Sequence, residues 1–127
     1  MATGNSFDEL LNTKKKKLSF FQNLIIVATA DRYLDEQESD FLVTIGQQLE
    51  LSEQDTSPIA ENLGVLSFII PEDGMQKTLE LQTLVMMMLQ DGNLADKEYN
   101  LCLEYARRVG YPKELLDDMI NQLKVGQ

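Results

Sequence analysis

The chain has 127 residues, 43% of them hydrophobic, and its formal net charge is −10. This length favours one domain, and the apolar content is enough for one core and too high for a disordered chain. So acidic a surface repels nucleic acid and anionic lipid and attracts cations or basic partners. We therefore expect protein partners, which the composition does not identify, and no binding to nucleic acid.

The residue inventory argues against catalysis and against a zinc site. The sequence has no His, and Cys102 is its only cysteine. Without His it lacks the commonest general base and the commonest zinc ligand, and no Ser-His or Cys-His nucleophile can form. A single cysteine excludes an intramolecular disulfide, which agrees with a cytoplasmic location. No apolar run approaches the roughly 18 residues of a membrane span. The sequence therefore predicts a cytoplasmic protein without enzymatic activity, without a certain cofactor and without membrane insertion.

The first half of the chain predicts three helices after a flexible segment over residues 1–13. Apolar residues recur with a period near 3.6 over 17–30 and again over 35–50, as in amphipathic helices. Ser52 is a candidate N-cap for a third helix near 53–63.

The second half predicts three more helices. The apolar residues 65–70 fit either a short strand or a buried connector, and we favour the connector because no second strand exists to pair with them. Helices are expected over 75–90 and 95–109, with Gly110 as the C-cap of the second, and Pro112 begins the last helix. No segment alternates with period two, so the sequence predicts an all-α bundle of five to seven helices.

Residues 14–30 have two incompatible interpretations. Four lysines, an apolar run and Ala28-Thr29-Ala30 are typical of a cleaved secretory signal. The same residues fit the first core helix of the bundle. Gln22 and Asn23 interrupt the apolar run and leave it short for a signal.

An internal repeat with an offset of sixty residues favours the core helix. When residues 84–112 are laid below 24–52, element boundaries and core positions coincide. The matched pairs include Asp31 with Asp91, Leu34 with Leu94 and Glu38 with Glu98. The second copy lies in the middle of the chain, where no signal peptidase acts, so its leading helix belongs to the fold. We therefore predict one domain over 14–127, with two related helix–turn–helix halves at about 18–63 and 75–125.

The repeated motif resembles that of the tellurite-resistance TerB-like proteins, whose domain also occurs in some DjlA-type membrane co-chaperones. In that family an apolar helix ends in Ala-Asp-Gly-x-Ile/Leu-x-x-x-Glu, in two related halves of an all-helical domain. Here residues 30–38 read ADRYLDEQE and residues 90–98 read QDGNLADKE. The resemblance covers about residues 15–125. It implies a helical domain with no established catalytic activity, a link to stress and tellurite phenotypes, and an acidic patch proposed to bind divalent cations.

The chain departs from that family pattern at two positions. Arg32 stands at the glycine of the motif, and Ala95 stands at the polar cap of the second copy. If the first position requires positive φ, a residue other than Gly costs about 1 kcal/mol there. These departures put a ligand role in doubt for either half.

The second motif also looks like the last eight positions of an EF-hand calcium loop. Counting back, two loop positions that require oxygen ligands fall on Met87 and Leu89. In the first copy they fall on Val27 and Thr29. Neither copy supplies both ligands, so the sequence argues strongly against a standard EF-hand site.

The acidic residues of the two motifs have a structural and a functional interpretation. As a structural element, each carboxylate caps a turn or the first turn of a helix. As a functional element, two halves packed with pseudo-twofold symmetry would bring both turns into one all-oxygen patch that suits Ca²⁺, Mg²⁺ or Mn²⁺. The candidate metal ligands are Asp31, Asp35, Glu38, Asp91, Asp96 and Glu98.

Three other features favour ordinary structural roles. Met86, Met87 and Met88 are expected to pack in the core, since consecutive helical residues point about 100° apart and cannot share an ion. Lys14–Lys17 form a solvated helix start, with docking on an acidic partner as the alternative. Cys102 is expected to be an inert core thiol. We predict a non-enzymatic, stress-associated interaction module that can also carry a weak divalent-cation patch. The alternative is a divalent metal-binding regulatory protein that uses the two acidic turns.

Overall fold

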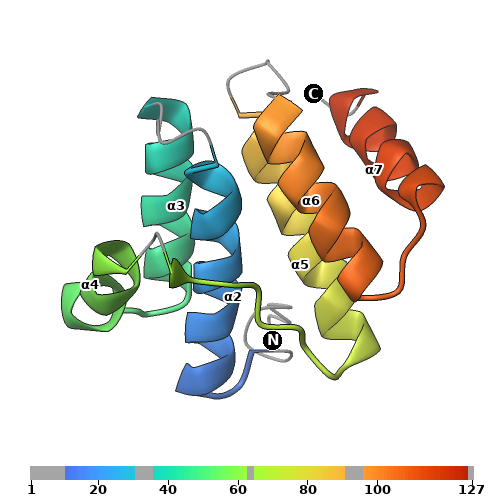
Figure 1. The fold of residues 1–127 in the computed structure, drawn as a ribbon. Helices are drawn as coiled ribbons and strands as arrows, with labels where there is room; N and C mark the ends of the chain where they lie inside the picture. The colour runs from blue at the N-terminus through green and yellow to red at the C-terminus, as the bar shows by residue number, and fades with distance from the viewer. Residues whose placement is uncertain (1–10, 31–35, 63–64, 91–95, 126–127) are drawn as a thin grey trace, which may run out of the picture.

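The computed structural model describes residues 11–30, 36–62, 65–90 and 96–125, which form six α-helices and no strand (Figure 1). The helices are α2 (Lys14–Ala28), α3 (Glu36–Gln48), α4 (Glu53–Glu61), α5 (Gly74–Met88), α6 (Asp96–Arg108) and α7 (Lys113–Val125). The predicted all-α class is confirmed for this part of the chain, and the segment before α5 is a connector, as expected. None of these helices is long and apolar enough to cross a membrane.

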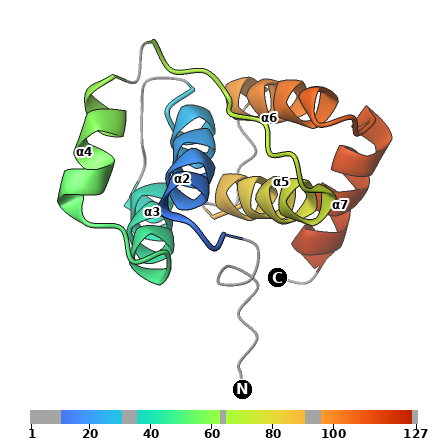
Figure 2. The ribbon, with the colours of Figure 1, turned by 90° about the horizontal axis from the view of Figure 1, so that it is seen from below.

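The helices α2 and α5 lie at the centre of the bundle and contact each other (Figures 1 and 2). On one side α3 and α4 pack against α2, and on the other side α6 and α7 pack against α5. The helices α3 and α6 both begin at the same end of the bundle (Figure 1). The connector between α4 and α5 crosses the bundle from the first group of helices to the second (Figure 2).

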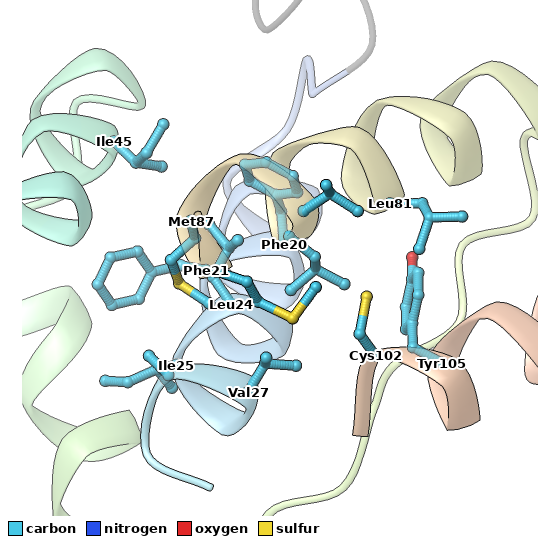
Figure 3. Packing of buried hydrophobic residues seen from close by; sticks show 14 of the residues in the cluster. Phe20, Phe21, Leu24, Ile25, Val27, Ile45, Leu81, Met87, Cys102 and Tyr105 are labelled. Carbon is cyan, nitrogen blue, oxygen red and sulfur yellow. The ribbon is translucent and has the colours of Figure 1, made fainter. Parts of the chain in front are cut away.

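A single apolar core joins the two groups of helices. Figure 3 shows Phe20 and Leu24 of α2 near residues of α5 and α6. Burial of a side chain of this size contributes about 2 kcal/mol. The core side chains with no exposed surface include Phe20, Leu24, Val27, Leu81, Leu84, Met87, Cys102, Tyr105 and Leu116. The lysines and apolar run at 14–28 therefore form α2, one of the two central helices of the bundle.

The N-terminus of α2 is set by a cap that the predicted range missed. The Lys16 amide donates to the Thr13 hydroxyl over 3.1 Å, so the helix begins at Lys14 rather than near Lys17. Leu11 precedes this cap and is completely buried in the core.

The helices α3 and α6 end in the same way, each on a residue with a left-handed backbone. Glu50 has φ 59° and Gly110 has φ 92°. The Leu51 amide donates to the Gly46 carbonyl over 3.0 Å, and the Tyr111 amide donates to Ala106 over 2.8 Å. These are the hydrogen bonds of a Schellman motif, in which glycine is the preferred left-handed residue. Gly110 is therefore the expected C-cap, and Glu50 holds the same conformation at a steric cost.

Replacing Glu50 by Gly is expected to raise the free energy of unfolding by about 0.5–1 kcal/mol, because the steric cost of positive φ exceeds the added freedom of the unfolded chain. Gly110→Ala is expected to lower it by about 1 kcal/mol; no atom lies within 4 Å of the added Cβ, so the backbone alone resists the change. Urea denaturation measures both values. Glu50→Ala is the control, because it removes the side chain and keeps the left-handed strain. Equal stabilisation by Ala and Gly at position 50 would contradict this explanation.

Candidate functional site

The predicted acidic patch is only partly within the described residues. Asp31, Asp35 and Asp91 lie outside them. Asp96 is the exposed first residue of α6. Among the residues that the structure describes, no group of three or more His, Cys, Asp or Glu side chains is placed to hold a metal ion. The convergence of the two turns into one cation site therefore stays a prediction.

Glu38 and Glu98, the other two candidate ligands, occupy corresponding places in α3 and α6. Each is the third residue of its helix, and their exposed fractions are 2% and 4%. Neither residue is without an interaction partner. A carboxylate in the first turn of a helix is stabilised by the free amides and by the helix dipole. Their position and burial agree with the structural interpretation.

The structure places a different carboxyl, that of Glu80, inside the core. The α5 helix begins at the N-cap Asp73, whose carboxylate accepts from the Gln76 amide over 3.0 Å. Gln76 and Glu80 are four residues apart and therefore share one face of α5. The Gln76 side-chain amide donates to Glu80 Oε2 over 2.8 Å. Glu80 is 1% exposed, so its carboxyl requires partners from other elements.

Two further donors reach Glu80 Oε1 from neighbouring helices. Asn23 of α2 donates from Nδ2 over 2.8 Å, and the hydroxyl of Tyr105 on α6 donates over 2.9 Å. Asn23 also holds the connector, because its Oδ1 accepts from the Ile69 amide over 2.9 Å and its Nδ2 donates to the Ile69 carbonyl over 2.8 Å. One buried polar cluster, formed by Asn23, Gln76, Glu80 and Tyr105, thus ties α2, α5, α6 and the connector together.

The electrostatics of this polar cluster favour protonated groups. Burial disfavours the ionised carboxyl and raises the pKa of Glu80, although the hydrogen bonds from Asn23, Gln76 and Tyr105 act in the opposite direction. Burial, reinforced by the negative charge of Glu80, raises the pKa of Tyr105. The rings of Tyr105 and Phe68, a residue of the connector, pack edge to face with 5.3 Å between their centroids. A carboxyl this enclosed offers no approach to a substrate, and the cluster fits a structural role.

Sequence reasoning missed this polar cluster, although two local signals point to it. Asn23 interrupts an otherwise apolar run in α2. Gln76 and Glu80 form an i,i+4 pair, and Leu79 and Leu81 flank Glu80 in the sequence. A polar side chain at such a position implies a buried partner. The identity of the partner was not predictable, because Asn23 and Glu80 are 57 residues apart in sequence.

The structure corrects one core prediction and supports another. Met87 and Met88 are completely buried, but Met86 is 42% exposed, so its expected place in the core is wrong. Met86 shares an exposed face of α5 with Gln82, which lies four residues earlier. Cys102 is completely buried, and burial raises the pKa of its thiol to about 12, as expected of an unreactive core thiol.

The lysine cluster Lys14–Lys17 lies at the start of α2 beside a hollow. Lys14 pairs with Asp55 of α4 at 3.1 Å, and its side chain is 66% exposed. Backbone hydrogen bonding at Ser52, followed by the Lys14 ammonium, lowers the pKa of Asp55. An open hollow of about 730 Å³ lies between α2, α4 and the connector, lined partly by Leu18 and Ile69. An exposed ion pair of this kind contributes little stability, so these lysines belong mainly to a solvated helix start.

A second hollow, the α2–α3 groove, has a largely apolar lining. Phe21 and Ile25 of α2 form its floor with Leu42 of α3, and the start of α4 forms one wall. Its volume is about 380 Å³. Val43 stands at the groove with 57% of its surface exposed. Exposed apolar surface arranged around a hollow is typical of a site that contacts another molecule.

A scan against protein-family models, a search of curated proteins and a search of solved structures each returned no match. The TerB-like resemblance therefore rests on the two sequence motifs alone.

Proposed function

We propose that this chain is a non-enzymatic, stress-associated interaction module with TerB-like architecture. The observation that carries the proposal is the α2–α3 groove, an apolar hollow with Val43 exposed at it. Protein-binding surfaces commonly combine an apolar floor with a polar rim. The stress-associated role is proposed from the motif resemblance. We also propose a cytoplasmic location, because the single cysteine excludes an intramolecular disulfide.

The architecture that we propose consists of two related halves, and the helix boundaries support it. The helices α2 and α5 begin and end sixty residues apart, as do α3 and α6. The left-handed residues Glu50 and Gly110 have the same offset, and so do the hydrogen bonds of the two Schellman motifs. Two unrelated segments would have no reason to share the same helix lengths, caps and spacing. A duplicated helix–turn–helix unit accounts for it.

The proposed function predicts a direct protein partner. The tagged full chain is cross-linked in the cells that express it and captured, and each captured protein is then purified and titrated against the chain. We expect one partner that binds the purified chain at a fixed stoichiometry. A matched bait of similar size and net charge controls for charge-driven capture. If no captured protein binds the purified chain better than it binds this bait, the interaction-module proposal is wrong.

The second candidate function is divalent-cation binding at the two acidic turns, favoured by the paired motif positions of Glu38 and Glu98 at the starts of α3 and α6. Thermal unfolding of EDTA-treated protein, with and without millimolar Ca²⁺, Mg²⁺ or Mn²⁺ at fixed ionic strength, separates the candidates. The interaction module predicts at most a weak ion-specific shift. A site filled at one hundred times Kd would add about 2.7 kcal/mol, which is several degrees for this domain size. A shift abolished by Asp31→Asn or Asp91→Asn would establish the metal-binding function instead.

A further inference from the structure

The two halves differ in how their helix pairs are covered. In the second half, α7 packs against both α5 and α6. Two aliphatic side chains of α7, Leu116 and Ile120, enter the core with exposed fractions of 0% and 5%. They are four residues apart and so project from one face of the helix. The surface between α5 and α6 is therefore sealed by an i,i+4 aliphatic pair.

In the first half the corresponding helix cannot supply this seal. The positions sixty residues before Leu116 and Ile120 are Thr56 and Ala60, on α4. Thr56 lines the α2–α3 groove and Ala60 is exposed. The main packing of α4 is against α2, and Figure 2 shows it set apart from α3. Because α4 carries small side chains at these positions and packs mainly on α2, the groove between α2 and α3 stays open. The corresponding surface between α5 and α6 is covered by α7.

The acidic residues near the groove favour a basic binding partner. Residues 36–61 contain no Lys or Arg. Glu53 is the first residue of α4, and it lines the groove. Charges of one sign around an apolar floor favour a partner of opposite charge. Glu38 is buried, and Asp55 and Glu50 pair with Lys14 and Lys17 of α2. The remaining acidic side chains in this range are exposed, and they are Glu36, Asp40, Glu53 and Glu61.

We propose that the α2–α3 groove docks a basic amphipathic helix of a protein partner, which inserts two aliphatic side chains four residues apart as α7 does on α5 and α6. The inference rests on the proposed interaction function and names its site and the chemistry of its partner. An aliphatic i,i+4 pair fills a hollow of about 380 Å³ lined by Phe21, Ile25 and Leu42. Basic residues on the flanks of the helix then face the exposed acidic side chains at Glu36 and Asp40 of α3 and at Glu53 of α4.

The probe for this inference is a synthetic helix derived from α7. It carries the thirteen residues Lys113–Val125 with Asp117→Lys. A hydrocarbon staple replaces the exposed positions 114 and 118 and keeps the short peptide helical, since isolated helices of this length are marginal. A second peptide with Leu116→Ser and Ile120→Ser has the same charge and the same staple. Binding of both fluorescent peptides to the full chain is measured by anisotropy, and the contacted amides are mapped by NMR.

Two protein variants separate groove binding from charge attraction. Val43→Asp adds a negative charge in the groove, and Val65→Asp adds the same charge on the connector, where the side chain is 82% exposed. Charge attraction alone predicts that both variants bind the basic probe slightly more tightly. Groove docking predicts that Val43→Asp binds at least about tenfold more weakly while Val65→Asp does not, because a carboxylate replaces apolar contact. Thermal unfolding confirms that each variant is folded.

We expect the aliphatic probe to bind, to perturb amides of α2 and α3, and to lose affinity with Val43→Asp. The inference is overturned if the probe does not bind, if the serine peptide binds equally well, or if both Asp variants behave alike. These results would not contradict the interaction function. A captured partner that binds Val43→Asp as tightly as it binds the unchanged protein would then use another surface. A failure of the interaction function is a different result, the absence of any direct partner.

Discussion

Replacing Asn23 by Ala is expected to lower the free energy of unfolding by about 3 kcal/mol. Asn23 is 1% exposed and makes three hydrogen bonds, two with the backbone of Ile69 and one with the carboxyl of Glu80. Alanine removes all three and leaves the amide and carbonyl of Ile69 without their side-chain partner. The two bonds to Ile69 are partly buried, and the bond to Glu80 is buried. A fully buried polar group left unpaired costs about 1–3 kcal/mol and a partly buried one costs less, and the cavity left by the side chain adds to the loss. Urea denaturation measures the loss.

The neighbouring Gln22 provides a matched control. Its side-chain amide donates to the carbonyl of Ser67 over 2.8 Å, so it also holds the connector, but at the exposed surface. Water replaces that hydrogen bond, and Gln22→Ala is expected to change the free energy of unfolding by no more than about 0.5 kcal/mol. Amide hydrogen exchange at Ile69 should accelerate strongly in Asn23→Ala and little in Gln22→Ala. Equal effects of the two substitutions would show that burial of the Asn23 contacts is not what stabilises the connector.

The helices could be predicted from the sequence because their signals are local. For α3, apolar periodicity predicted 35–50, and the helix spans Glu36–Gln48. For α6, the predicted range 95–109 compares with Asp96–Arg108, and Gly110 has the positive φ expected of a C-cap. Each of these features depends on residues within one or two turns of the helix. A short stretch of sequence therefore contains all the information that fixes it.

The polar cluster and the open groove were not predicted, because each depends on elements far apart in the chain. The Glu80 carboxyl is satisfied by α2 and α6 as well as by its own helix. The groove is open because α4 packs mainly against α2, whereas α7 packs against both helices of its pair. The repeat aligns Thr56 of the first half with Leu116 of the second, so the sequence shows that the first half has no aliphatic residue there. Only the packing of the helices shows which surface is left uncovered as a result. Three of the six predicted metal ligands lie outside the described residues, so the cation patch stays a prediction.

The Glu80 carboxyl should make the stability of the protein depend on pH, and Glu80→Gln should remove that contribution. Burial raises the pKa of Glu80 in the folded state above its ordinary value of 4.5. Below the ordinary value the carboxyl is protonated in both states and carries no ionisation cost. As the pH rises from there to the folded-state pKa, the unfolded chain ionises first, unfolding releases a proton, and the free energy of unfolding falls. Above the folded-state pKa the loss is complete and constant.

Glutamine at position 80 keeps the shape of the side chain and cannot ionise. Its oxygen accepts from Asn23 and Tyr105 as the carboxyl does. Its amide then faces Gln76, whose own side-chain amide turns over to present its oxygen, so the hydrogen-bond pattern survives. The variant therefore removes the ionisation of the carboxyl with little other change. Alanine at this position would leave three donors unpaired and would confuse the two effects.

The measurement is the difference in free energy of unfolding between Glu80→Gln and the unchanged protein from pH 4 to pH 8. We expect this difference to increase in favour of the variant as the pH rises and then to level off. A tenfold change in the acid dissociation constant on folding corresponds to about 1.4 kcal/mol. Glu72→Gln, at an exposed position of the connector, controls for the loss of one surface charge. A constant difference across this pH range would mean that the three donors cancel the cost of burying the carboxylate, and the polar cluster would then hold a charge in the core.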